Sequence, residues 1–129
     1  MDSEVVVSAF QDDSLGNDDA IVIAEKIKKG ELDTKTVTRD AIRRAESVNP
    51  KLNAIAEENF DFAQANSEKN FSGFFQGVPT FIKDTDEVPG LPLYLGSRSL
   101  PGESSDKYSK AAKQIIDTGL NCLGTTTTP

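Results

Sequence analysis

Lys83 stands at the boundary between an apolar segment and a loop rich in proline and glycine, within the stretch GVPTFIKDTDEVPG at residues 77–90. The β-branched and aromatic side chains at 78–82 predict a strand, and Pro79 lies near its start, where a strand tolerates proline. Burial beside Phe81 and Ile82 would lower the pKa of the lysine, because desolvation favours the neutral amine. A neutral amine can act as a base, although a lysine at a strand end is more often a solvated residue.

Other groups that could do chemistry lie in less favourable contexts. Ser104 and Ser105 stand in GESSD, which lacks the glycines of an oxyanion site, and are better suited to precede or cap a helix. Asp84, Asp86 and Glu87 superficially resemble a calcium loop, but the turn glycine and closing glutamate are missing, so a solvated acidic turn is favoured. The sequence therefore predicts no metal ion and no cofactor.

Cys122 is the single cysteine, and the sequence contains no histidine. It lies in the apolar stretch 120–123, so we interpret it as a buried, unreactive thiol and not as a nucleophile. One cysteine forms no internal disulfide, and nothing points to an oxidising compartment.

The charge balance limits the partners. Twenty-one acidic against 14 basic residues give a formal net charge of −7, which disfavours direct contact with nucleic-acid phosphates or an anionic membrane. No stretch approaches the roughly 18 consecutive apolar residues of a membrane span, and residues 1–10 lack the positive start of a secretory signal. We therefore expect a cytoplasmic protein with no membrane partner.

Helical periodicity organises most of the chain after a polar N-terminal arm. The expected helices run from Asn17 to Gly30, from Asp33 or Thr34 to Asn49 and Pro50, around residues 60–65, and from Asp106 to Gly119. Residues 88–102 hold alternating prolines and glycines and predict an irregular loop, and residues 121–128 predict a second strand. We expect a disordered arm at 1–16 and the N-terminal fragment of a domain at 17–129.

The order of helix, glycine turn and apolar strand is typical of half of a parallel α/β unit. About two strands accompany about four helices, which leaves sheet edges without partners. We therefore expect the chain to be the front part of a larger α/β protein.

Several short motifs, in order, resemble the front part of the amidase signature family. They are Gly77-Val78-Pro79, Ile82-Lys83-Asp84, Val88, Gly90 and Gly96-Ser97. The likeness extends upstream to GELDTKTVTRDAIRRAESVNPKLNAIAEENFDFA and downstream to AAKQIIDTGLNCLGTTTTP, so it covers nearly all of the chain from residue 17. It implies the N-terminal part of an amidase-signature-like fold, with helices and the first strands of a mixed sheet, incomplete in this chain.

The family resemblance also implies a chemistry. Members cleave carboxylic amide C–N bonds with a serine nucleophile, a bridging serine that follows a cis peptide bond, and a lysine. Lys83 matches that lysine, Asp84 is expected to be structural, and Ser97 and Ser99 match the loop after the lysine and not the nucleophile segment. Because the family's glycine- and serine-rich segment lies downstream of the equivalent of Pro129, we expect this chain to be inactive alone. The complete enzyme would take a small-molecule amide substrate and could form a homo-oligomer, and the substrate-binding residues are not assigned.

Two alternatives stay open at this point. The chain could be a non-catalytic interaction module, docking a partner through Phe71, Phe74 and Phe75 or through open strand edges. It could also be a fragment of an amidotransferase subunit that acts on charged transfer RNA, since that subunit shares the family's front motifs.

Overall fold

The computed structural model describes residues 6–97, 99–100 and 102–128. Over these residues the elements, in chain order, are α1 (Ala20–Lys28), α2 (Thr34–Leu52), β1 (Ile55–Glu58), α3 (Phe60–Asn66), β2 (Pro79–Lys83), α4 (Lys110–Asp117) and β3 (Asn121–Thr126). The expected helices and strands are all present, and β1 is an additional strand.

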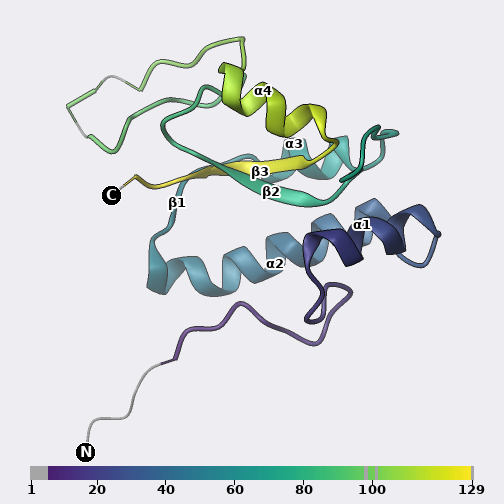
Figure 1. The fold of residues 1–129 in the computed structure, drawn as a ribbon. Coiled ribbons are helices and arrows are strands. Elements are labelled where there is room, and N and C mark those ends of the chain that lie inside the picture. The colour runs from purple at the N-terminus through teal and green to yellow at the C-terminus, as the bar shows by residue number, and fades with distance from the viewer. Residues whose placement is uncertain (1–5, 98, 101, 129) are drawn as a thin grey trace, which may run out of the picture.

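The strands form a mixed sheet in the order β1-β3-β2, so β3 is central. β3 pairs in parallel with β2, from Pro79 opposite Asn121 to Lys83 opposite Thr126, and antiparallel with β1. Figure 1 shows α4 on one side of this sheet and α1 and α2 on the other. The expected α/β class with a mixed sheet is confirmed.

Short polar side chains begin three of the helices. Asp19, Asp33 and Ser109 are the N-caps of α1, α2 and α4, and each side chain accepts a hydrogen bond from the backbone N–H three residues later. Our expectation of a cap at Asn17 for the first helix was therefore two residues early. The expected cap at Asp106 was three residues early, because Ser109 makes that bond instead.

The end of α2 differs from the expected stop at Asn49 and Pro50. Pro50 lies inside the last helical turn, and the helix continues to the C-cap Asn53, whose φ of 48° is left-handed. The Asn49 side chain accepts hydrogen bonds from the backbone N–H groups of Ala54 and Ile55, at 2.9 and 3.0 Å. This amide satisfies the first donors after the helix and turns the chain directly into β1.

Alternate residues of β3 face the two sides of the sheet. Leu123 packs with Ile42 of α2 and Ala63 of α3, whereas Cys122 packs with Ala112 of α4 and Ile82 of β2. Cys122 is buried, as expected, and burial raises the pKa of its thiol. β3 is therefore the strand around which both hydrophobic layers are organised.

Asn121 is a buried polar residue at the start of β3, with 1% of its surface exposed. Its side-chain amide donates to the Thr38 hydroxyl at 3.3 Å and to the Ala63 carbonyl at 3.0 Å. The backbone N–H of Asn121 donates to the Val78 carbonyl at 2.8 Å. These bonds link the central strand to α2, α3 and the segment before β2.

Part of the expected N-terminal arm packs against α2. Arg44 of α2 forms an ion pair with Asp13 at 2.6 Å, and their side chains are only 13% and 11% exposed. Leu15 lies in a hydrophobic cluster with Ile23 and Val37. Packing contacts thus begin before residue 17, where we expected the ordered chain to start, while residues 1–5 of that arm lie outside the described residues.

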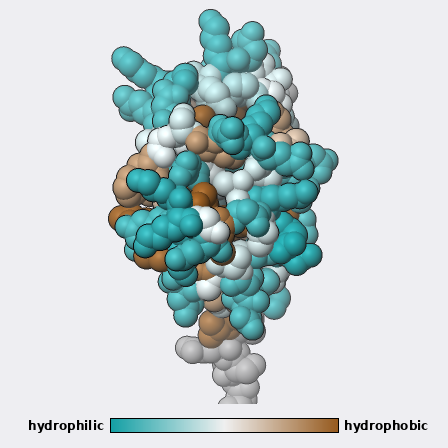
Figure 2. Space-filling model, turned by 90° about the vertical axis from the view of Figure 1, so that its right-hand side faces the viewer, coloured by the Kyte–Doolittle hydropathy of each residue, from teal (hydrophilic) through white to brown (hydrophobic). Residues whose placement is uncertain are grey.

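The surface in Figure 2 is mostly hydrophilic, with hydrophobic residues in small separate places. Among the phenylalanines of the loop before β2, Phe75 packs against the cluster that contains Leu15, while Phe74 is 63% exposed. Their rings meet edge to face at 5.0 Å. No helix in the described part of the chain is both long and apolar enough to cross a membrane.

Candidate functional site

Lys83 is the last residue of β2, and backbone hydrogen bonds fix the chain around it. It lies opposite Thr126 in the parallel pairing, and the next N–H, from Asp84, donates to the Thr126 carbonyl at 2.9 Å. The Lys83 carbonyl accepts from the backbone N–H of Asp86 at 3.1 Å, closing a turn. The position of the Lys83 backbone is thus set by both β3 and the turn.

The Lys83 side chain is exposed, contrary to the water-poor setting that we expected. Phe81 packs toward Ile42 and Leu123, on the α2 side, and Ile82 packs toward α4. Side chains alternate along a strand, so only Phe81 shares a face with Lys83, and Lys83 is exposed beyond it at the strand end. Among the described residues, the Lys83 side chain therefore lacks the apolar cover that we expected.

Two carboxylates of the following turn are used as structural hydrogen-bond acceptors. Asp84 is 2% exposed, and its Oδ1 accepts from the backbone N–H of Tyr94 at 3.1 Å. Asp86 is half-buried, and its Oδ1 accepts from the Ser109 hydroxyl at 2.8 Å. The bond from Tyr94 agrees with the structural role expected for Asp84. The expected solvated acidic turn is wrong for the buried Asp84, whereas Asp86 is partly exposed and Glu87 is exposed.

A cavity of about 570 Å³ opens at the carboxyl ends of the two parallel strands. It is lined by Asn53, Ile55, Ala56, Asp84, Tyr94, Gly96, Ser97, Thr127 and Thr128. Ligands of open α/β sheets commonly bind at this end of the strands. Lys83 precedes the lining residue Asp84 but does not itself line the cavity.

The loop after Lys83 forms one wall of this cavity through Tyr94, Gly96 and Ser97. Gly96 has a φ of 76° and packs so closely on Thr128 that a side chain there would clash. Ser97 lines the cavity, and its hydroxyl lies 2.7 Å from that of the exposed Ser99. Both serines lie in the loop that follows the lysine, as the motif match implied.

Ser104 and Ser105 form their hydrogen bonds with residues outside the turn at 83–86. Ser104 forms an isolated antiparallel bridge with Pro92, and the Ser105 hydroxyl accepts from the backbone N–H of Lys107 at 3.1 Å. They precede α4, as expected, but Ser109 caps it. Neither is hydrogen-bonded to Lys83 in the described structure.

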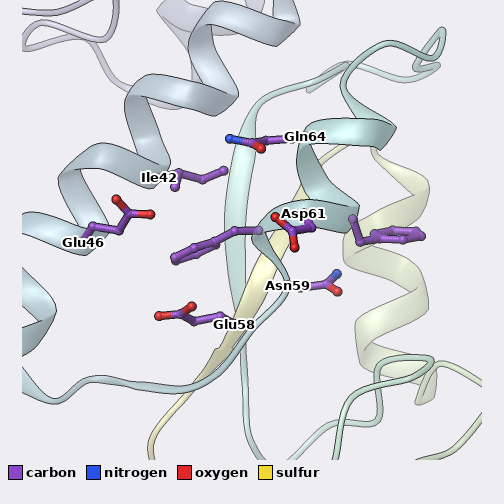
Figure 3. Close-up of a pocket in the computed structure, with 8 residues that line it drawn as sticks. Ile42, Glu46, Glu58, Asn59, Asp61 and Gln64 are labelled. Carbon is purple, nitrogen blue, oxygen red and sulfur yellow. The ribbon is translucent and has the colours of Figure 1, made fainter.

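A second cavity of about 570 Å³ lies between α2 and α3, and three of its eight lining residues are acidic. Figure 3 shows its labelled residues, with Glu46 on α2, Glu58 at the end of β1, and Asp61 and Gln64 on α3. The three carboxylates would repel an anionic ligand, so such a ligand is disfavoured here. In the part of the chain that the structure describes, no group of three acidic, histidine or cysteine residues is arranged to hold a metal ion.

The comparison with known proteins decides the family. Residues 36–129 match the family model named Amidase, a match that includes Lys83, the turn after it and β3. This chain belongs to the amidase family. The family resemblance drawn from the motifs around Lys83 is thereby confirmed.

Individual relatives agree with this assignment. The chain is 41% identical over 122 residues to the putative amidase AmiC of Mycobacterium tuberculosis, covering 93% of this chain and 26% of AmiC. It is 31% identical over 114 residues to the 6-aminohexanoate-cyclic-dimer hydrolase of Paenarthrobacter ureafaciens, covering 86% of this chain and 23% of that protein. The chain thus spans about a quarter of the length of these curated relatives.

The solved structures place the observed sheet within a known fold. A structure of 6-aminohexanoate cyclic dimer hydrolase complexed with substrate superposes with a TM-score of 0.79 at 30% identity, covering 87% of this chain and 24% of that one. The mixed α/β arrangement is therefore a partial form of the amidase-signature fold.

Proposed function

We propose that this chain supplies the lysine segment of an enzyme that hydrolyses carboxylic amide C–N bonds. The observation that carries the proposal is the placement of Lys83 at the carboxyl end of a parallel strand, within residues matched to the amidase family. The backbone on either side of Lys83 is held by bonds to β3 and to the following turn, which suits a residue that must be accurately placed. We further propose a small carboxylic amide as substrate and a cytoplasmic location.

The mechanism that we propose passes protons through Lys83. The neutral amine takes a proton from the bridging serine, which takes one from the nucleophilic serine as its oxygen attacks the amide carbon. The C–N bond then breaks, and the proton held by Lys83 returns to the leaving nitrogen. Water hydrolyses the acyl-serine ester and restores the enzyme. By the family resemblance, both serines belong to a segment that follows the residues matched here.

Lys83 is exposed in this chain, whereas the proposed mechanism requires a neutral amine at this position. A lysine works as a base only if its neutral form is populated near the working pH, and removal of water around the amine achieves this. We therefore propose that further protein covers Lys83 in the complete enzyme. The isolated chain, without either serine of the triad, should show no amide hydrolysis above background.

A chimera tests the proposal directly. Residues 1–129 replace the matching quarter of AmiC, and ammonia release from simple primary amides is measured for the wild type and for Lys83→Ala. We expect an active chimera in which Lys83→Ala lowers kcat by at least about 10³-fold, as losses within cooperative catalytic groups do. Lys110→Ala is the matched control, because Lys110 is also exposed but lies in the first turn of α4.

Two results would count against this function. An active chimera that keeps its rate in Lys83→Ala would exclude the proton-transfer role of Lys83. A folded chimera without activity, in which the chain alone captures a partner protein, would favour the non-catalytic interaction module instead.

A further inference from the structure

The turn after Lys83 is connected to α4 by a continuous series of hydrogen bonds. The backbone N–H of Asp86 donates to the Lys83 carbonyl, and the Asp86 carboxylate accepts from the Ser109 hydroxyl at 2.8 Å. The Ser109 hydroxyl oxygen also accepts from the backbone N–H of Ala112, which makes it the N-cap of α4. The backbone N–H of Ser109 donates to the Glu87 carbonyl at 3.0 Å. These hydrogen bonds tie the start of α4 to the turn that follows Lys83.

Asp84 makes the corresponding connection on the other side of the turn. Its backbone N–H donates to the Thr126 carbonyl of β3, and its buried carboxylate accepts from the N–H of Tyr94 in the loop that lines the cavity. The two aspartates thus tie the residues next to Lys83 to three separate segments: β3, the 91–97 loop and α4.

These carboxylates act through hydrogen-bond geometry and not through ion pairing. Five ion pairs occur among the described residues, and neither Asp84 nor Asp86 takes part in any of them. Their hydrogen-bond donors in the described structure are the backbone N–H of Tyr94 and the neutral hydroxyls of Thr85 and Ser109. The side-chain oxygen of asparagine in the same place could accept the same hydrogen bonds without a negative charge. A substitution by asparagine therefore separates a role in hydrogen bonding from a role of the charge.

We propose that Asp84 and Asp86 are positioning residues for Lys83 in the amide-hydrolysis reaction. This inference rests on the proposed function of Lys83. The exposed side chain of Lys83 has four flexible carbons, so the position of its backbone determines the region that the amine can reach. Since a misplacement of about 1 Å can lower a rate by about 10²-fold, loosening either aspartate should reduce catalysis without removing a reacting group.

The first measurement uses the chain itself and requires no activity. Backbone amide hydrogen exchange is compared in the wild type, Asp84→Ala and Asp84→Asn. We expect Asp84→Ala to speed exchange at Tyr94 by about tenfold or more, and Asp84→Asn to stay within about threefold of wild type because its side-chain oxygen still accepts. The amide of Leu93, bonded to the Glu103 carbonyl, is the internal reference and should not change.

The same comparison applies to Asp86. Asp86→Ala should speed exchange at Ala112, since Ser109 loses the acceptor that orients it, and Asp86→Asn should not. Asp106→Ala is the control, because Asp106 is an exposed carboxylate of the same loop region. If exchange rises equally across the whole chain, the aspartates support overall folding and the proposal is overturned.

The second measurement uses the AmiC chimera. The alanine variants of Asp84 and Asp86 should lower kcat by about 10-fold to 100-fold with KM within about threefold, and the asparagine variants should restore kcat. Equal losses in Asn and Ala variants would show a role for the charge and overturn the positioning role. If Lys83→Ala leaves the chimera unaffected, the proposed function fails, while the exchange data still decide whether the aspartates hold the turn.

Discussion

Removing Arg44 should destabilise the protein more than any other single change of a surface cation in the described structure. The Arg44 guanidinium donates to Asp13 at 2.7 and 2.6 Å, to the Gly16 carbonyl at 2.9 Å and to the Gln11 carbonyl at 3.3 Å. It also lies 5.6 Å from the centre of the Phe10 ring. Loss of one partner from a fully buried pair costs about 3–5 kcal/mol. The Arg44–Asp13 pair is only partly buried, and Asp13 keeps its bonds from the N–H groups of Leu15 and Gly16, so we expect a smaller loss of about 2 kcal/mol for Arg44→Ala.

The effect should depend on pH in a defined direction. The hydrogen bond from Arg44, together with backbone N–H donors, holds the pKa of Asp13 below its ordinary value of 3.8. A lowered pKa in the folded state adds stability above the unfolded value, and that stability is lost as the pH falls through the folded pKa. The difference in unfolding free energy between wild type and Arg44→Ala should therefore be full at pH 6–7 and shrink below about pH 3.8.

Urea titration followed by circular dichroism measures this difference at pH 7 and at several acidic pH values. Arg43→Ala is the matched control, because Arg43 is the exposed neighbour on the same helix and should change the free energy by less than about 0.5 kcal/mol. If Arg44→Ala and Arg43→Ala have equal effects, or if the Arg44→Ala effect is independent of pH, the ion pair does not anchor the arm to α2.

Three further predictions concern the sheet. Leu123→Ala should lower the unfolding free energy by about 2–5 kcal/mol in urea titration, since Leu123 is 2% exposed; a loss under about 1 kcal/mol would contradict that packing. Thr125→Val should raise it by about 1 kcal/mol, because the buried hydroxyl has no hydrogen-bond partner among the described residues, and a clear loss would reveal an unseen partner. Lys83→Ala should change it by less than about 0.5 kcal/mol, because Lys83 is exposed, and a large loss would show that its side chain makes stabilising contacts.

Much of the fold was predictable because local signals and tertiary packing agree. The apolar stripes predicted the bounds of each helix to within a few residues, and the β-branched residues around Pro79 predicted β2. β1 was not predicted as a strand, since its acidic residues Glu57 and Glu58 do not alternate with apolar ones and its pairing with β3 is distant in sequence. Helix caps were misplaced because Asn17, Asp19, Asp106 and Ser109 are all acceptable caps, and only the folded geometry selects among them.

The candidate site was predictable in position but not in environment. The order of residues around Lys83 located the lysine at the end of a strand, as observed. Its exposure could not be read from apolar neighbours, because Phe81 and Ile82 turn their side chains toward the two opposite layers. The bond between Asp86 and Ser109 joins residues 23 positions apart, and a serine that caps a helix gives no sequence signal of its second partner.

The central place of β3 has a consequence for biosynthesis. In the sheet of the described residues, β1 and β2 are separated by β3, which is translated after both. While the ribosome is still making the segment before Asn121, each earlier strand has its hydrogen-bonding groups available and no native neighbour to accept them. At this stage the open strand edges can pair with other chains, so slower translation of this segment should increase misassembly.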